Sequence, residues 1–476
     1  MKKNLICAFL AMISLISGCS LIPEYSRPDA PVPAQWPKGD AYKTDVDANS
    51  PPAAAITWRQ FFTDPKLQQI IEIALQNNRD LRIAALNVER ARGIYGIQRA
   101  ELLPTIDAFA DGARQKVPGD LSGTGESEII EQYSVNLGSV AWEIDFFGRI
   151  RSLEDRALRE YFATEQARRS AQILLIAEVS NAYLTLAADR ESLKLARYTL
   201  DTQQQAYELI QRRYEIGLSQ ELDLLRVQTQ VDAARVDTAI FTRLVAQDES
   251  ALNLLVGDSV PPELLPQDLS SVAQSREISA GVSSEVLLYR PDILASENLL
   301  MAANANIGAA RAALFPRIAL TTSVGTASAE LSGLFQGGSG AWMFAPQIVM
   351  PIFDPRAWSA LTVTKTDRKI AVARYEQSIQ TAFKEVADAL ATQGTIEEQL
   401  LAQKSLTDAA AETYRLQNTR YLKGIDSYLG VIDAQRSLYA AQQGLVSFSL
   451  AKLSNQSRLY AVLGGGADTA QAPEKP

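Results

Sequence analysis

One stretch, residues 147–217, limits the fold more than any other part of this chain of 476 residues. From Val179 onward, apolar and aromatic residues recur at steps of three and four, which is the spacing of a coiled-coil seam. No proline interrupts the stretch, so about 70 residues at roughly 1.5 Å each predict a helical rod of about 100 Å. The seam consists of Val179, Ala182, Leu186, Asp189, Leu193, Ala196, Leu200, Gln203, Tyr207, Ile210 and Tyr214.

The end of this rod recurs near the C-terminus. Gly217 follows the first seam and Gly424 a second one, and each is placed as the left-handed residue that ends a helix. The surrounding residues match at a constant offset of 207 (420 − 213), and the earlier parts of the two halves match at 212 (316 − 104). The chain is therefore an internal duplication. The matched pairs are Arg213/Arg420, Tyr214/Tyr421, Gly217/Gly424, Leu222/Leu429, Gln228/Gln435, Asp80/Asp292, Arg99/Arg311 and Pro104/Pro316.

Each half is predicted to run helix, strand, loop, strand, long helix, tight turn and shorter helix. The alternating, strand-like segments are residues 105–113, 131–145, 317–327 and 342–352. The expected organisation is a signal peptide (1–18), a lipidated N-terminal tether (19–64), a first repeat (65–257), a linker (258–284), a second repeat (285–466) and a C-terminal tail (467–476).

The first residues have the pattern of an export signal. Lys2 and Lys3 precede an apolar run, which ends in Ile16-Ser17-Gly18-Cys19. This ending resembles a bacterial lipobox, in which the cysteine becomes the acylated first residue of the mature chain. We therefore expect Cys19 to be a lipid anchor. The alternative is a plain signal peptide with a chance cysteine.

Composition excludes several classes of function. The chain contains no histidine, and Cys7 would be removed with the signal, so the commonest general base and thiol catalysis are both missing. Removal of Lys2 and Lys3 takes the net charge from −9 to −11, which makes nucleic acid an unsuitable partner. No clustered catalytic or metal-binding motif is present. We therefore expect no enzyme activity, no cofactor and no metal site.

Four strands per chain cannot close a barrel, because about eight are the minimum. Four strands left open would expose their edges. The chain is therefore expected to form a cyclic oligomer in which the copies share one barrel. A dimer would give 8 strands and a trimer 12, and the strand count alone does not choose between them.

Five short segments, spread over nearly the whole mature chain, are more specific than the periodicity. They are Trp58 with Phe61-Phe62 and Asp64, residues 143–149 (EIDFFGR), residues 305–311 (ANIGAAR), Pro351-Ile352-Phe353 and Gly464-Gly465-Gly466. Together they resemble the outer-membrane efflux factors of the TolC/OprM type, the exit ducts of tripartite drug pumps. The lipobox favours the OprM branch.

The resemblance implies a mainly α fold with β structure. It implies a homotrimer with a 12-stranded barrel in the outer membrane, a long helical barrel in the periplasm and a mixed equatorial region. The implied partners are outer-membrane lipid, a periplasmic adaptor and a proton-driven inner-membrane transporter of the RND class. The implied function is passive, gated conduction of drugs and other small molecules to the exterior.

In this family the tight turns form a periplasmic tip that is closed at rest by acidic side chains and tyrosines. The resemblance assigns Asp433, Tyr421 and Asp223 to this gate, with Tyr214 as the repeat partner of Tyr421 and the turns at Gly217 and Gly424. This sequence departs from the family at two positions. Gly430 stands where some members carry a second aspartate, and Asp426 stands where some carry an arginine.

Simpler roles remain open for these residues. Asp433 and Asp223 each precede an arginine by three residues, Arg436 and Arg226, so ordinary surface ion pairs would also explain them. The tyrosines could pack in the seam, and the strand segments could be soluble hairpins. If the second turn ends before Asp426, that residue and Asp433 share one helix face.

Other functions are compatible with parts of the pattern. A type I secretion duct would have the same fold. A periplasmic coiled-coil adaptor or scaffold would share the long helices but would need a compact β-domain. The strand pairs beside the long helices favour the channel over the adaptor.

Overall fold

The computed structural model describes residues 20–42, 53, 56–278 and 283–466. The signal segment, Cys19 and the C-terminal tail lie outside these residues. The chain divides into two compact units. Unit 1 comprises residues 1–29, 87–164 and 295–375, and unit 2 comprises residues 30–86, 165–294 and 376–476.

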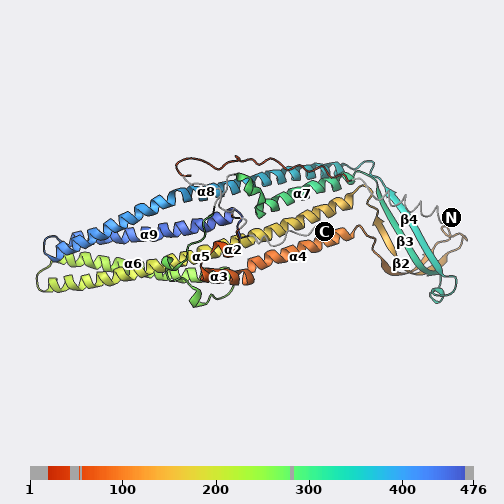
Figure 1. Ribbon diagram of the computed structural model, residues 1–476. Helices are drawn as coiled ribbons and strands as arrows, with labels where there is room; N and C mark the ends of the chain where they lie inside the picture. The colour runs from red at the N-terminus through yellow and green to blue at the C-terminus, as the bar shows by residue number, and fades with distance from the viewer. Residues whose placement is uncertain (1–19, 43–52, 54–55, 279–282, 467–476) are drawn as a thin grey trace. The chain divides into compact units, whose positions relative to one another are not determined.

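Unit 1 contains one antiparallel sheet of four strands, in the order β1-β2-β3-β4 (Figure 1). Its strands are β1 (Asp107–Val117), β2 (Glu128–Glu143), β3 (Arg317–Ser328) and β4 (Gly340–Val349). The first two come from the first repeat and the last two from the second, so the β2–β3 pairing joins the repeats. A register shift between Ser139 and Trp142 marks a bulge. Within the described residues, β1 and β4 each pair with only one strand.

The long helices are confirmed in both repeats. They are α5 (Arg149–Glu215) with 67 residues and α8 (Pro355–Leu422) with 68. Each follows a strand pair and a shorter helix, α4 (Arg79–Ala100) or α7 (Pro291–Ala312). Part of α5 is apolar enough to cross a membrane by length and composition, but 67% of that stretch is buried inside the protein. A helix buried in a protein core passes the same test of length and composition.

Unit 2 contains the helices that return from the tight turns, α6 (Glu221–Val256) and α9 (Tyr428–Val462). It also holds α2 (Trp58–Phe61) and α3 (Pro65–Asn77). The break between α3 and α4 falls at Asn78. The Asn78 side chain accepts a hydrogen bond from the amide of Leu81 and donates one to the carbonyl of Leu255 in α6. It therefore caps a helix and fixes the break against α6.

The motif of Trp58, Phe61-Phe62 and Asp64 forms part of a core in unit 2. Phe61 is fully buried and stacks on Tyr460 with ring centres 4.1 Å apart. The Tyr460 hydroxyl donates to the carbonyl of Ile56. Asp64 caps α3 and also accepts from the amide of Ala273. The motif thus ties the first helices to α9 and to the segment between the repeats.

The described start of the chain is extended, but it is not a free spacer. Arg27 donates two hydrogen bonds of 2.7 Å to Glu297 of α7, whose side chain is only 3% exposed. The Asn304 amide donates to the carbonyl of Pro23. A Cβ on Gly308 would lie 2.6 Å from the side chain of Ile22, so the contact needs glycine there. Residues 20–29 are therefore fixed along α7 within unit 1.

Candidate functional site

Two tight turns join α5 to α6 and α8 to α9 (Figure 1). They have the same backbone hydrogen bonds. In the first, the amides of Gly217 and Leu218 donate to the carbonyls of Tyr214 and Arg213 at 2.9 and 2.7 Å. In the second, the amides of Gly424 and Ile425 donate to the carbonyls of Tyr421 and Arg420 at 2.9 and 3.0 Å. The glycine φ angles are +76° and +70°. Both turns are Schellman caps, so the duplication extends to backbone geometry.

A group of buried side chains, called here the tip cluster, packs beside these turns. Tyr421, the expected gate tyrosine, is only 8% exposed. Its ring meets that of Tyr428 edge to face at 4.9 Å. The other members come from α5, α6 and α9, so the cluster joins both hairpins of one chain. The tip cluster consists of Ile210, Val227, Tyr421, Tyr428, Val431 and Ile432.

A polar contact crosses the tip cluster between the two repeats. Arg213 donates a hydrogen bond of 3.2 Å to the Tyr421 hydroxyl. Its guanidinium carbon also lies 5.5 Å from the centre of the Tyr421 ring, within the range of a cation–π contact. Burial raises the pKa of Tyr421; the charge of Arg213 opposes this shift and that of Asp223 adds to it. Tyr421 is therefore a neutral hydroxyl at physiological pH.

Asp426 is held within its own turn. Arg420 donates two hydrogen bonds to its carboxylate, at 2.5 and 3.1 Å. The Arg420 guanidinium lowers the pKa of Asp426. Helix α9 begins only at Tyr428, with Ser427 as its N-cap. The condition under which Asp426 and Asp433 would share a helix face is therefore not met, because Asp426 lies in the turn and not in the helix.

The other two acidic residues differ from each other. Asp223 lies 3.7 Å from Arg226, so the surface ion pair expected as an alternative is present there. Asp433 is exposed, and within the described part of the chain it forms no ion pair with Arg436 or any other residue. Its carboxylate is free to act on a nearby ion or ligand.

The repeat-related tyrosines also differ. Tyr214 is 40% exposed, whereas Tyr421 is buried. The structure thus brings Tyr421 together with two residues that sequence reasoning did not assign to the gate, Arg213 and Tyr428. The repeat alignment already named Arg213, but only as a match for Arg420. Only the packing of the two hairpins shows that Arg213 contacts the gate tyrosine.

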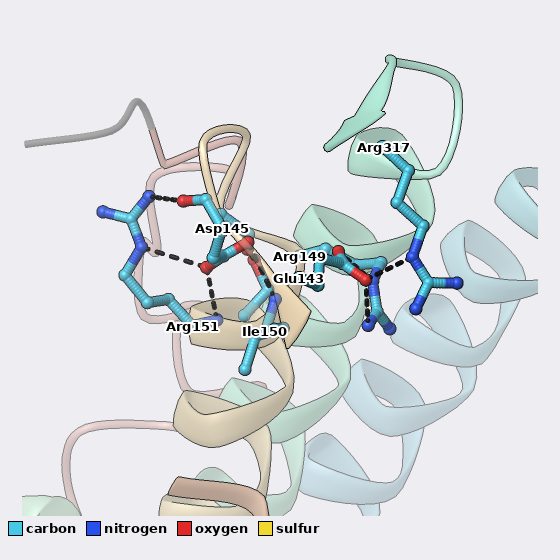
Figure 2. Close-up of polar contacts among 8 residues, drawn as sticks. Glu143, Asp145, Arg149, Ile150, Arg151 and Arg317 are labelled. Carbon is cyan, nitrogen blue, oxygen red and sulfur yellow. Dashed lines mark hydrogen bonds and ion pairs between the residues drawn. The ribbon is translucent and has the colours of Figure 1, made fainter. Parts of the chain in front are cut away.

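A second polar centre lies where β2 passes into α5 (Figure 2). Glu143, which is 9% exposed, accepts bidentate hydrogen bonds from Arg149 at 2.8 and 2.9 Å and contacts Arg317 at 2.5 Å. Asp145 accepts from the amides of Ile150 and Arg151 and from the Arg151 side chain. It therefore caps the first turn of α5. These contacts fix the direction in which the long helix leaves the sheet.

Comparison with known proteins identifies the family. The sequence model of the family described as "Outer membrane efflux protein" matches residues 70–258 and 282–465. The antibiotic efflux pump outer membrane protein ArpC and the toluene efflux pump outer membrane protein TtgC, both of Pseudomonas putida, are each 49% identical over 453 residues. In both cases the alignment covers 95% of this chain and 93% of the relative.

Comparison of the fold with solved structures leads to the same kind of protein. The open state of the MtrE outer membrane channel of Neisseria gonorrhoeae superposes with a TM-score of 0.85 at 38% identity. This match covers 94% of the present chain and 99% of MtrE. Sequence and structure agree over nearly the full length. The chain is an outer-membrane efflux component and belongs to the outer membrane efflux protein family.

Proposed function

We propose that the chain is the gated exit duct of a tripartite pump. Three copies close one 12-stranded barrel in the outer membrane, and their helices continue it as a tunnel into the periplasm. The observation that carries the proposal is the sheet of four strands, in which β1 and β4 each have one partner within the described residues. Pairing β4 of one copy with β1 of the next removes both edges. The choice of three copies over two rests on the family resemblance.

The proposed cargo follows from the names of the relatives. ArpC and TtgC are named for antibiotic and toluene efflux, so we assign to this duct apolar solvents and drug-like small molecules. Its partners are a periplasmic adaptor and an RND-class inner-membrane transporter, which supplies the energy. The duct itself conducts passively and carries out no covalent step. Asp433, Asp223, Asp426, Tyr214 and Tyr421 belong to its periplasmic gate.

The shared barrel is tested by disulfide crosslinking between copies. Ala113→Cys on β1 is combined with a series of single cysteines along β4, from Ala341 to Ala345. Oxidation should join the chains into a covalent ring that migrates at three chain masses, while Ala113→Cys alone should stay monomeric. A ladder that stops at two chains would contradict the trimer. Failure of every β4 position to crosslink would contradict the shared barrel.

We also propose that Cys19 carries the lipid anchor. The barrel spans the membrane by itself, and a single acyl chain adds only weak, reversible binding. Cys19→Ala, exported with a substitute signal, should lose the acyl mass and still insert. A mature protein that begins at another residue without an acyl group would refute the anchor.

A further inference from the structure

An open pocket of about 580 Å³ lies in unit 2, next to the tip cluster along α9, since Asp433 in its lining follows Ile432 of that cluster. Residues of α5, α6 and α9 line it, so it joins the first hairpin to the second within one chain. Its volume falls in the range of small-molecule sites, roughly 300–1,000 Å³. Of its lining residues, the proposed duct function uses only Asp433, in the gate. The polar residues that matter here are Gln203, Asp237, Asp433, Arg436 and Tyr439.

Gln203 is an unsatisfied acceptor in the wall of this cavity. Its side chain is 3% exposed, and within the described residues its Oε1 atom has no hydrogen-bond partner. A buried acceptor without a hydrogen bond lowers the stability of a protein. A donor supplied by an occupant of the cavity would remove this cost.

The charges of the cavity favour a cation. Asp237 and Asp433 contribute two negative charges and Arg436 one positive charge, which leaves −1. Within the described chain, neither carboxylate forms an ion pair. Burial, with the charge of Asp237 adding to it, raises the pKa of Tyr439 to about 12. Tyr439 therefore stays neutral and does not offset the negative charge.

We propose that this cavity binds a small organic cation with two or more N–H donor groups, of the linear polyamine class. One nitrogen donates to Oε1 of Gln203, and the others meet the carboxylates of Asp237 and Asp433. A bare metal ion fits less well. No group of three or more Asp, Glu, Cys or His side chains in the described residues could hold one, and the volume greatly exceeds a single ion.

The test uses spermidine as the probe and isothermal titration calorimetry on the full-length protein in detergent at low salt. Asp237→Asn keeps the side-chain shape and removes one charge. The loss of one charge-assisted hydrogen bond, about 1.5–3 kcal/mol, should weaken spermidine binding at least tenfold. Gln203→Leu removes the acceptor without a change of charge and should weaken binding about threefold to tenfold.

The matched control is Asp232→Asn on the same helix. Asp232 is exposed, pairs with Arg235 and does not line the cavity. This variant should bind spermidine within about twofold of the parent, since an exposed pair contributes little. An equal loss in Asp232→Asn and Asp237→Asn would overturn the proposal, because general attraction to an acidic surface would then explain the binding.

Folding is checked by thermal melting without spermidine. Gln203→Leu should melt at or above the parent temperature, because it removes a buried unpaired acceptor. A parent that releases no heat and gains no melting temperature with millimolar spermidine would overturn the proposal and leave ordered water as the occupant.

Discussion

Arg213 in the first hairpin donates a hydrogen bond to the hydroxyl of Tyr421 in the second, and its repeat partner Arg420 makes a different contact. Arg420 pairs with Asp426 in its own turn. The position that matches Asp426 in the first repeat is 219 (426 − 207), which is Ser219. Because Ser219 carries no charge, Arg213 has no carboxylate there and reaches the other hairpin instead.

Tyr421→Ala should loosen the tip. Loss of a buried aromatic side chain costs about 3–5 kcal/mol and also removes the contacts to Arg213 and Tyr428. We expect a higher basal conductance in planar bilayers. Tyr421→Phe keeps the ring and should lie near the parent. Tyr198→Ala, at a tyrosine of α5 that is 71% exposed and outside the gate, serves as the control. Parent-like conductance in Tyr421→Ala would mean that the tyrosine only packs.

Asp433 and Asp426 should affect ion selectivity differently. Asp433 has no ion pair within the described residues, so Asp433→Asn should reduce the preference for cations over anions. Asp426 is already neutralised by Arg420, so Asp426→Asn should change selectivity less. Reversal potentials in a salt gradient measure both. A larger effect of Asp426→Asn would refute this order.

A carboxyl pair between α5 and α6 should make stability depend on pH. The carboxyl groups of Asp189 and Asp248 interact beside the Arg190–Glu249 ion pair. Burial and the neighbouring Asp189 raise the pKa of Asp248 from 3.8 to about 7. Burial also raises the pKa of Asp189. The folded protein therefore holds a proton that the unfolded chain releases near pH 4.

The stabilisation from this shared proton is present at low pH and is lost as the pH rises through about 7. Solvent near the pair limits it to on the order of 1–2 kcal/mol. The melting temperature of the parent, relative to that of Asp248→Asn, should fall between pH 5 and 8. Asp232→Asn should follow the parent. Parallel curves for parent and Asp248→Asn would exclude the shared proton.

Substitution of the turn glycines should lower stability only through the strain that it places on the backbone. Gly217 and Gly424 have positive φ, and a Cβ on either would meet nothing within 4 Å. Alanine at either position should therefore destabilise by a similar amount, about 1 kcal/mol. Gly93 in α4 has the same open surroundings but a helical backbone, so Gly93→Ala should stabilise by about 0.5–1 kcal/mol. Chemical denaturation would show the opposite signs.

Glu143 should be the most sensitive carboxylate at the junction in Figure 2. Glu143→Gln leaves Arg149 and Arg317 facing each other without the charge between them. We expect a loss of about 1–3 kcal/mol in the free energy of unfolding. Asp354→Asn, which breaks the exposed pair with Arg356, should have no measurable effect. Equal effects of the two variants would contradict the role of burial.

Features that depend on neighbouring residues could be predicted from the sequence. The seam period, the missing proline and the positions of Gly217 and Gly424 located both long helices within about two residues of their ends. Alternation located the four strands, and the export motif gave an expectation for Cys19 that lies outside the described residues.

Features that depend on packing could not. Tyr214 and Tyr421 occupy equivalent places in the two repeats, yet only Tyr421 is buried. Whether Asp426 shares a helix face with Asp433 depends on where the next helix begins, after Gly424 or after Ser427. The helix begins after Ser427, and hydrogen bonding to Arg420 keeps Asp426 in the turn. The cavity beside Gln203 is formed by residues of three helices, so no pattern of neighbouring residues in the sequence predicts it.

The contact between the start of the chain and α7 sets an order of assembly. Tyr25 donates to Glu297, a residue 272 positions later, and Arg27 binds the same carboxylate from 270 positions away. A chain that emerges N-terminus first presents residues 20–29 long before their partner helix exists, and closing so long a loop is entropically costly. Residues 20–29 therefore reach their final position late in folding. In a chain that ends before Glu297, residues 20–29 have no partner helix to bind. Binding of residues 20–29 to α7 therefore requires that the first part of the second repeat is already present.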